Sequence, residues 1–532
     1  MEQTAKTILL YATILISGFG CSANRHSHPA PPMDARAESF VSNAGIYEIG
    51  SENYDADFGT ITVPENRKKS ISRLMTLPVL RIHARTKSPA EPIFGLAGGP
   101  GQSNMSWGRL ESFLPDHDFV IVGYRGVDGS TVLHLPEVEK AFKGEEDDLL
   151  GEASMRSIGQ AWSAGAQRLT AQGIDLDGYT MLEVIEDMES VRRALGYERI
   201  HLLSESYGTR VAYLYGLTYP ARISRSAMIG VNPPGHFVWD PGMIDAQLRH
   251  YAALWSKDSL MSLRSQDLYA TMRTVLSAMP RKWLLFSIDP GKVKTVTFSL
   301  LFHRATAAMV FDAYVAAEQG DPSGLALMSF AYDYVLPSMI NWADLGSKAV
   351  SADFDSTQDY LNNMEPPNAP LGSPLSKLLW GPLRYGRWPT QQLPETFRKP
   401  RESDVETLLL SGNVDFSTPA EFATSELLPF LRHGRQIILS ECGHVNDVWD
   451  VRPKNTRHIL TSFYKTGVPD TSMNEYAPMD FHVSWSFPAL AKVGLGTCVF
   501  IIAAITGGVV WWRRSRKASK AKGLISRPAT NS

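Results

Sequence analysis

The feature that most restricts the fold is the alternation of short apolar runs with helix-like segments between residues 46 and 466. Several runs, among them 119–123 and 200–203, are apolar throughout, as expected for strands buried on both faces of a mainly parallel sheet. The intervening segments place apolar side chains at helical spacing, as Val184 and Met188 do. We therefore predict an α/β protein with an open, mainly parallel sheet flanked by helices. The expected strands are 59–63, 75–83, 92–97, 119–123, 200–203, 227–231, 407–411 and 436–439.

This alternation stops between residues 233 and 402. The stretch is rich in Trp, Met, Leu and Ala, and it combines helical periodicity with several prolines. We interpret it as a helical insertion between two strands, which would form a lid over the carboxyl ends of the strands. A chain of 532 residues is too long for one simple core, so a large domain with an insertion and terminal appendages is the natural division.

The amino-terminal end resembles a signal peptide. An apolar run, residues 8–20, follows a lone Lys6 and is too short to cross a bilayer comfortably. Cys21 comes directly after the run, as at a lipoprotein cleavage site, although Gly18 occupies the position where such sites usually have Leu. Lipidation of Cys21, ordinary cleavage and an uncleaved anchor therefore remain alternatives.

The carboxyl-terminal end is expected to cross a membrane. Residues 493–512 contain no charge, and about 20 helical residues match one hydrocarbon thickness. Trp511 and Trp512 would lie at the interface, and six Arg or Lys residues follow between Arg513 and Lys522. Because basic flanks stay in the cytoplasm, we expect a single-span anchor with the globular part on the extracytoplasmic side.

Composition excludes some functions and leaves others open. The net charge of −3 provides no electrostatic reason to expect a nucleic-acid partner. The sequence contains no spaced Cys/His cluster and no phosphate-binding loop, so we expect neither a metal nor an organic cofactor. The three cysteines do not reveal the compartment, because only Cys442 lies in the globular part.

A strand-to-helix turn carries the first chemical signal. The expected strand 200–203 continues through Ser204, Ser206 and Gly208 into a helix-like run. This is the context of a nucleophile elbow, usually written G-x-S-x-G, with Ser204 in place of the first glycine. Ser206 would then present its hydroxyl above the sheet at the helix amino terminus, where negative charge is stabilised. The simpler interpretation is that Ser206 only caps the helix.

A glycine-rich loop follows the expected strand 92–97 and contains Gly98, Gly99 and Gly101. Glycines let a backbone turn sharply and approach a ligand closely. We expect the N–H of Gly99 to be one donor of an oxyanion hole and the N–H of Tyr207 to be the other. Taken alone, the loop is better interpreted as a plain Gly-Pro turn.

Two further polar residues each follow the end of an expected strand. Asp415 comes after strand 407–411, and His444 comes after strand 436–439. The chain order of Ser206, Asp415 and His444 is the order found in α/β-hydrolases. Asp447 is an alternative acid, but its nearness to His444 in sequence favours a local turn residue. We therefore predict a triad with Ser206 as nucleophile, Asp415 as acid and His444 as base.

Seven stretches together resemble the proline iminopeptidase and tripeptidyl aminopeptidase family of α/β-hydrolases, across roughly residues 45 to 465. They read FGTITVPEN, GGPGQS, VIVGYRGVDGS, SVRRALGYERIHLLSESYGT, AAEQGDPSGL, LLLSGNVDFSTP and ECGH. The resemblance implies the α/β-hydrolase fold, and it assigns the same triad and the same two oxyanion donors. Two positions depart from the family pattern: Gly123 stands where Asp is usual, and Ser204 replaces Gly.

The resemblance also implies an activity, a serine aminopeptidase that acts on the amino termini of peptides. A lid carboxylate of this family usually binds the substrate amine, and Glu318 and Asp333 are the residues we consider for that role. An esterase or amidase for non-peptide substrates is the alternative, and a non-catalytic, membrane-tethered binding protein is a second one. Neither the substrate nor the oligomeric state follows from the sequence.

These interpretations divide the chain into eight segments. We expect a signal peptide (1–20), a Pro-rich linker (21–44), the first part of the hydrolase core (45–232), the helical lid (233–402), the second part of the core (403–467), a linker (468–487), a transmembrane helix (488–512) and a basic cytoplasmic tail (513–532).

Overall fold

A nine-stranded mixed sheet organises the computed structural model, which describes residues 28–144 and 148–525, with side chains as far as Ser515. The strand order is β1-β2-β3-β5-β4-β6-β7-β10-β11. The three pairs β1–β2, β2–β3 and β3–β5 are antiparallel. Every pair from β5 to β11 in this order is parallel. The strands are β1 (Phe40–Ile49), β2 (Glu52–Pro64), β3 (Leu74–Ile82), β4 (Ala90–Leu96), β5 (His117–Val122), β6 (Ile200–Glu205), β7 (Ile223–Ile229), β10 (Glu406–Gly412) and β11 (Gly434–Leu439).

All eight expected strands overlap a strand of this sheet, and β1 is an additional one. It begins at Phe40, inside the segment that we expected to be linker up to residue 44. All of its side chains are half-buried or exposed, because β1 lies at one edge of the sheet and pairs only with β2. β1 therefore lacks a run of apolar residues like those by which the other strands were predicted.

Helices cover both faces of the sheet, because neighbouring side chains along a strand point to opposite faces. Leu202 packs in the apolar cluster that includes Met188 of α4 and Val211 of α5. Leu203, the next residue, packs in another cluster with Leu460 of α18. The helices concerned are α4 (Met181–Ala194), α5 (Tyr207–Thr218) and α18 (Pro453–Thr466).

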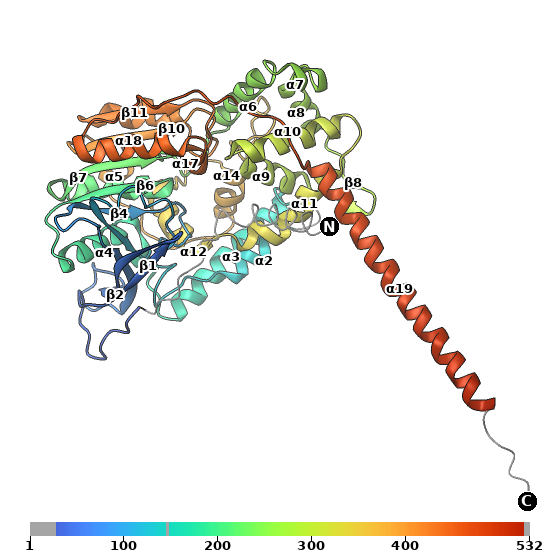
Figure 1. Cartoon of the computed structure of the whole chain (residues 1–532), viewed down its shortest axis with the longest axis horizontal. Coiled ribbons are helices and arrows are strands. Elements are labelled where there is room, and N and C mark those ends of the chain that lie inside the picture. Colours follow the sequence, from blue (N-terminus) through green and yellow to red (C-terminus); the bar gives the residue numbers. More distant parts are fainter. Residues whose placement is uncertain (1–27, 145–147, 526–532) are drawn as a thin grey trace, which may run out of the picture.

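The chain between β7 and β10 forms the largely helical insertion that we expected, and much of it has an apolar cluster of its own. In Figure 1 these green and yellow helices lie to one side of the sheet. The insertion also contains a short hairpin, β8–β9, that the sequence did not reveal. Its main elements are α6 (Pro241–Trp255), α7 (Ser259–Arg264), α8 (Leu268–Ser277), β8 (Lys282–Trp283), β9 (Phe286–Ser287), α9 (Pro290–Leu300), α10 (Arg304–Glu318), α11 (Ser323–Val335), α12 (Trp342–Leu345), α13 (Ser351–Asp353), α14 (Pro374–Trp380) and α15 (Glu395–Arg398).

Four further helices belong to the core. They are α2 (Pro136–Ala141) and α3 (Glu152–Ala171) before β6, and α16 (Ala420–Phe422) and α17 (Val445–Asp450) after β10.

The segment after α18 is packed rather than free. Met479, Phe481 and Phe487 are buried in the apolar cluster of the insertion. They lead into α19 (Phe487–Ile525), whose first turns lie against α11. Lys492 of α19 pairs at 2.6 Å with Asp321, which lies just before α11. The rest of α19 leaves the body of the protein (Figure 1). Its portion Phe487–Ser515 is long and apolar enough to cross a membrane by length and composition.

Candidate active site

Ser206 lies at a sharp turn between β6, which ends at Glu205, and α5, which begins at Tyr207. Its backbone angles are φ 52° and ψ −121°, a region that residues with a side chain rarely adopt and that costs strain. The turn is tight, because a Cβ on Gly208 would lie 2.0 Å from the carbonyl oxygen of Leu96. The strained turn places Ser206 at the carboxyl edge of the sheet, as a nucleophile elbow does.

Ser204 shows how the elbow tolerates its missing glycine. The side chain is fully buried, and its hydroxyl donates to the carbonyl oxygen of Ala227 on the neighbouring strand β7, at 3.1 Å. The extra hydroxyl therefore has a partner and does not disturb the turn.

Asp415 and His444 are in direct contact. The Nδ1 of His444 lies 2.8 Å from Oδ2 of Asp415, and the hydroxyl of Thr418 donates to the same oxygen. The backbone N–H groups of Ser417 and Thr418 donate to Oδ1 at 2.8 and 2.9 Å. Burial alone would raise the pKa of Asp415, but His444 and the Thr418 donors outweigh it and lower the pKa. Asp415 is therefore held as a carboxylate beside the imidazole.

Asp447, the alternative acid, has different partners. Its Oδ2 accepts hydrogen bonds from the backbone N–H groups of Gly443 and Arg304, both at 2.8 Å. Burial raises its pKa to about 6. This carboxyl group ties the His444 loop to the start of α10 in the insertion, whereas Asp415 is the carboxylate that meets the His444 ring.

Ser206 and His444 lie on either side of the end of β7. The N–H of Ser206 donates to the carbonyl oxygen of Ile229 at 2.9 Å, and a Cβ on the next residue, Gly230, would lie 2.9 Å from Cε1 of His444. Within the described residues, no hydrogen bond joins the Ser206 hydroxyl to the imidazole ring. Such hydrogen bonds are often long in enzymes without substrate and shorten when it binds.

The glycine loop after β4 runs beside Ser206. A Cβ on Gly98 would lie 3.3 Å from Cβ and 3.9 Å from Oγ of Ser206. Gly99 has φ 133°, a conformation that favours glycine. In the described part of the chain, no hydrogen bond uses the N–H of Gly99 or of Tyr207. Neither N–H group is therefore paired with another backbone group among the described residues.

A carboxylate that the sequence did not reveal compensates for Gly123. Asp128 accepts hydrogen bonds from the backbone N–H of Asn104 and Tyr124 and from the hydroxyl of Ser103. A Cβ on Gly123 would lie 2.7 Å from Cβ of Asp128. Asp128 therefore occupies the space that a side chain at position 123 would need, and it fastens the glycine loop to the end of β5. The unusual Gly123 was the available signal.

A second carboxylate that the sequence did not reveal, Asp344 of the insertion, binds the glycine loop. Asp344 accepts a hydrogen bond from the N–H of Gly101 at 2.9 Å, and the N–H of Asn341 donates to the Gly101 carbonyl at 2.8 Å. Lys348 pairs with Asp344 one helical turn away, and both side chains are fully buried. Burial raises the pKa of Asp344 and lowers the pKa of Lys348, while their mutual attraction opposes both shifts.

We predict that Asp344→Asn lowers the free energy of unfolding by about 3–5 kcal/mol, because it leaves the Lys348 cation buried without a counter-charge. Urea denaturation would measure the loss. Adding Lys348→Met should restore much of it. The matched control is Glu395→Gln, which breaks an exposed pair with Lys399 at the same spacing and should leave the midpoint unchanged. A single Asp344→Asn variant as stable as the parent would contradict the prediction.

Neither lid carboxylate considered for a substrate amine is free. Glu318 accepts a hydrogen bond from the hydroxyl of Thr271 at 2.7 Å, and Asp333 pairs with Lys292 at 2.8 Å. No described contact joins either carboxylate to Ser206. An amine-binding role for Glu318 or Asp333 thus has no support in the geometry.

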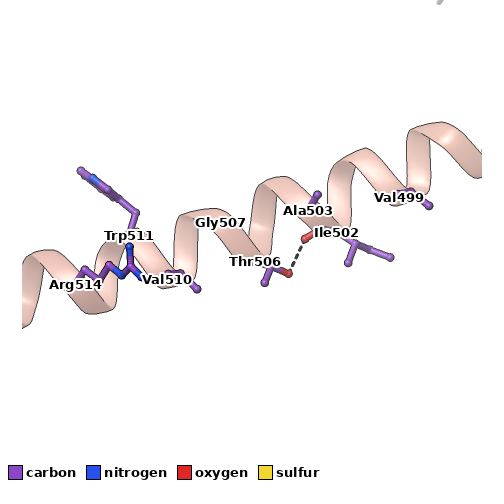
Figure 2. A pocket seen from close by; sticks show the side chains of 8 residues that line it. All are labelled: Val499, Ile502, Ala503, Thr506, Gly507, Val510, Trp511 and Arg514. Atoms are coloured by element: carbon purple, nitrogen blue, oxygen red, sulfur yellow. Dashed lines mark hydrogen bonds between the residues drawn. The ribbon is translucent and has the colours of Figure 1, made fainter.

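Of two hollows in the described surface, one lies apart from the candidate site and the other adjoins it. Figure 2 shows one that is lined by eight residues of α19 alone, among them Ile502 and Trp511, so no group of the site contributes to it. Another, narrow hollow lies between the insertion and the loop after β10, where Trp239, Phe416 and Thr418 line it. Thr418 contacts both Asp415 and His444, so this second hollow adjoins the candidate site.

A model of a known protein family matches part of the chain. Residues 91–306, from β4 into α10, match the family model described as alpha/beta hydrolase fold. The chain has the α/β-hydrolase fold. In this fold the turn after β6, the loop after β10 and the loop after β11 meet at the carboxyl edge of the sheet, and these are the positions of Ser206, Asp415 and His444.

Curated proteins similar to this chain include the tripeptidyl aminopeptidases of Streptomyces coelicolor and Streptomyces lividans. Each is 25% identical over 203 residues, which are 35% of this chain and 37% of the relative, so the match spans little more than a third of their length. Solved structures similar to this chain include an esterase from Exiguobacterium antarcticum. It has 14% identity and a TM-score of 0.33, and the match covers 76% of this chain and 98% of the esterase. A meta-cleavage product hydrolase from Pseudomonas fluorescens has 11% identity and a TM-score of 0.33 over 74% and 95%.

Proposed function

We propose that this α/β-hydrolase is a serine hydrolase in which Ser206 attacks the carbonyl carbon of an ester or amide. His444, oriented by Asp415, takes the serine proton and later returns it to the leaving group. An acyl-enzyme forms and water releases the acid. The N–H groups of Gly99 and Tyr207 stabilise the oxyanion. The strained elbow at Ser206 is the observation that carries the proposal, because backbone strain of this kind is kept where function needs it.

The substrate class that we propose is the amino-terminal end of short peptides. The support is the similarity to two tripeptidyl aminopeptidases and the resemblance in sequence described above. An esterase that acts on non-peptide substrates is the second candidate, because the same triad cleaves both ester and amide bonds.

A two-stage assay tests both levels of the proposal. A fluorophosphonate probe should label the parent protein and leave Ser206→Ala unlabelled. Chromogenic tripeptide amides with a free amino terminus should then be cleaved, whereas the acetylated peptides should not. Cleavage of simple esters with no peptide activity would overturn the aminopeptidase assignment, and absence of probe labelling would overturn the hydrolase assignment in favour of a binding protein.

We further propose that α19 anchors the enzyme in a membrane with the catalytic domain outside the cytoplasm. Arg513 and Arg514 begin the basic flank that should stay in the cytoplasm. Protease added to intact cells, or to spheroplasts where an outer membrane is present, should digest the enzyme domain and spare a tag placed after Ser532. Digestion of the tag with protection of the domain would reverse the orientation.

The packing of the first turns of α19 determines where the anchor can be removed. Phe487 and Ala491 are buried, whereas Val493 is exposed. We predict that a chain ending after Lys492 is folded and active and is released by alkaline carbonate, which leaves the parent in the membrane. A chain ending after Thr471 lacks Phe487 and its buried neighbours, so it should aggregate. An aggregated or inactive protein ending at Lys492 would contradict the prediction.

A further inference from the structure

We propose that the β8–β9 hairpin and the adjoining face of α11 form a second membrane contact, which inserts into the interfacial layer of the bilayer that α19 spans. We call this surface the hairpin patch and define it as Leu284, Leu285, Phe286, Phe330 and Tyr334. The inference rests on the anchoring part of the proposed function and is independent of the triad.

The hairpin has the composition of an interfacial insertion loop. Its sequence from Arg281 reads RKWLLF, so two cations precede an aromatic and three large apolar side chains. Leu285, at the tip, is 98% exposed and Leu284 is 65% exposed. Interfacial segments combine Trp, Phe and Leu with Lys or Arg, because the apolar side chains enter the acyl boundary and the cations meet lipid phosphates.

The apolar surface continues from the hairpin onto α11. The ring of Phe286 lies edge-on to Phe330, with centroids 6.4 Å apart, and Phe330 contacts Tyr334 at 5.0 Å. Phe330 and Tyr334 are 50% and 70% exposed. Isolated exposed apolar residues are ordinary, but a contiguous group of five large ones indicates a partner surface.

The position of the hairpin patch identifies that partner as the bilayer. The same helix, α11, contacts both strands of the hairpin and the first turns of α19. A Cβ on Gly324 of α11 would lie 2.9 Å from Cδ of Pro488, and the uncharged part of α19 begins at Val493. Figure 1 shows the hairpin beside the beginning of α19. The patch thus lies where the membrane surface must pass if α19 spans the bilayer.

The consequence is a defined orientation of the enzyme. A single helix would leave the domain free to tilt about its attachment, whereas two neighbouring contacts restrict that tilt. The insertion that covers the candidate site would then rest on the membrane surface.

Depth-dependent fluorescence quenching with the full-length protein tests whether the hairpin patch inserts into the bilayer. Cys21→Ala and Cys498→Ala remove two thiols, and the remaining Cys442 is buried with its pKa raised to about 11, so it should stay unlabelled. Leu285→Cys is labelled with nitrobenzoxadiazole, and the protein is reconstituted into phosphatidylcholine–phosphatidylglycerol vesicles with or without nitroxide on the acyl chains. The matched control is Leu263→Cys on α7, an apolar residue that is 84% exposed.

Acyl-chain nitroxide should quench the label at position 285 several-fold more than the label at position 263. A third protein keeps Cys498 as its labelled thiol and reports whether α19 is in the bilayer. If the label at Cys498 is quenched but the labels at positions 285 and 263 are quenched equally weakly, the hairpin contact is overturned while the anchor stands. If the label at Cys498 is not quenched, the anchor is overturned and this inference with it. Peptide hydrolysis, measured in parallel, tests the catalytic proposal separately.

Discussion

Ser206→Ala is expected to reduce turnover on the order of a millionfold while the protein remains folded. The loss is large because the hydroxyl oxygen is the atom that we propose to form the acyl-enzyme bond. The fold should be unaffected, because the side chain has no described hydrogen-bond partner and the turn is held by backbone bonds through Ile229 and Thr209. Initial rates with the best peptide substrate, together with a thermal unfolding curve, would measure both effects.

Ser204→Ala is the matched control for this experiment. It removes a hydroxyl two residues away, whose only described role is the hydrogen bond to Ala227, and it should retain most of the activity. The reverse result, an active Ser206→Ala and an inactive Ser204→Ala, would show that the nucleophile is misassigned.

Asp415→Asn is expected to reduce turnover by about ten-thousandfold. In the proposed mechanism the carboxylate accepts a hydrogen bond from the Nδ1–H of His444 and stabilises the imidazolium, whereas an amide can hold the ring in the wrong tautomer. Steady-state rates with the best peptide substrate would measure the loss. Turnover within tenfold of the parent would sink the assignment of Asp415 as the acid.

Asp447→Asn distinguishes the two carboxylates. Both described hydrogen bonds to Asp447 end on the same oxygen, so an amide oxygen can replace it and activity should persist. The parent's pKa at this position is raised from 3.8 to about 6, so ionisation opposes folding. The free energy of unfolding of the parent should therefore fall as pH rises from about 4 to 6, and the variant should lack that decrease. Urea denaturation at several pH values would measure it.

The sequence by itself determined the sheet and the positions of the chemical residues along it. Short apolar runs that alternate with helix-like segments identified eight of the nine strands, because strands buried on both faces are mainly apolar. Ser206, Asp415 and His444 each follow a strand end, and the carboxyl ends of parallel strands meet at one edge, so their grouping could be anticipated. The length and lack of charge of residues 493–512 likewise indicated a span without tertiary information.

The tertiary structure decided most of the contacts between polar groups. It places the Asp415 carboxylate on the His444 ring, as chain order predicts, and Asp447 on the backbone N–H groups of Gly443 and Arg304. It brought Asp344 to the glycine loop from 243 residues away. It also buried Phe481, in a segment that resembled a linker, and exposed Leu285. The reason is that the periodicity of a sequence records which face of its own element a residue occupies, whereas its partner depends on how distant elements pack.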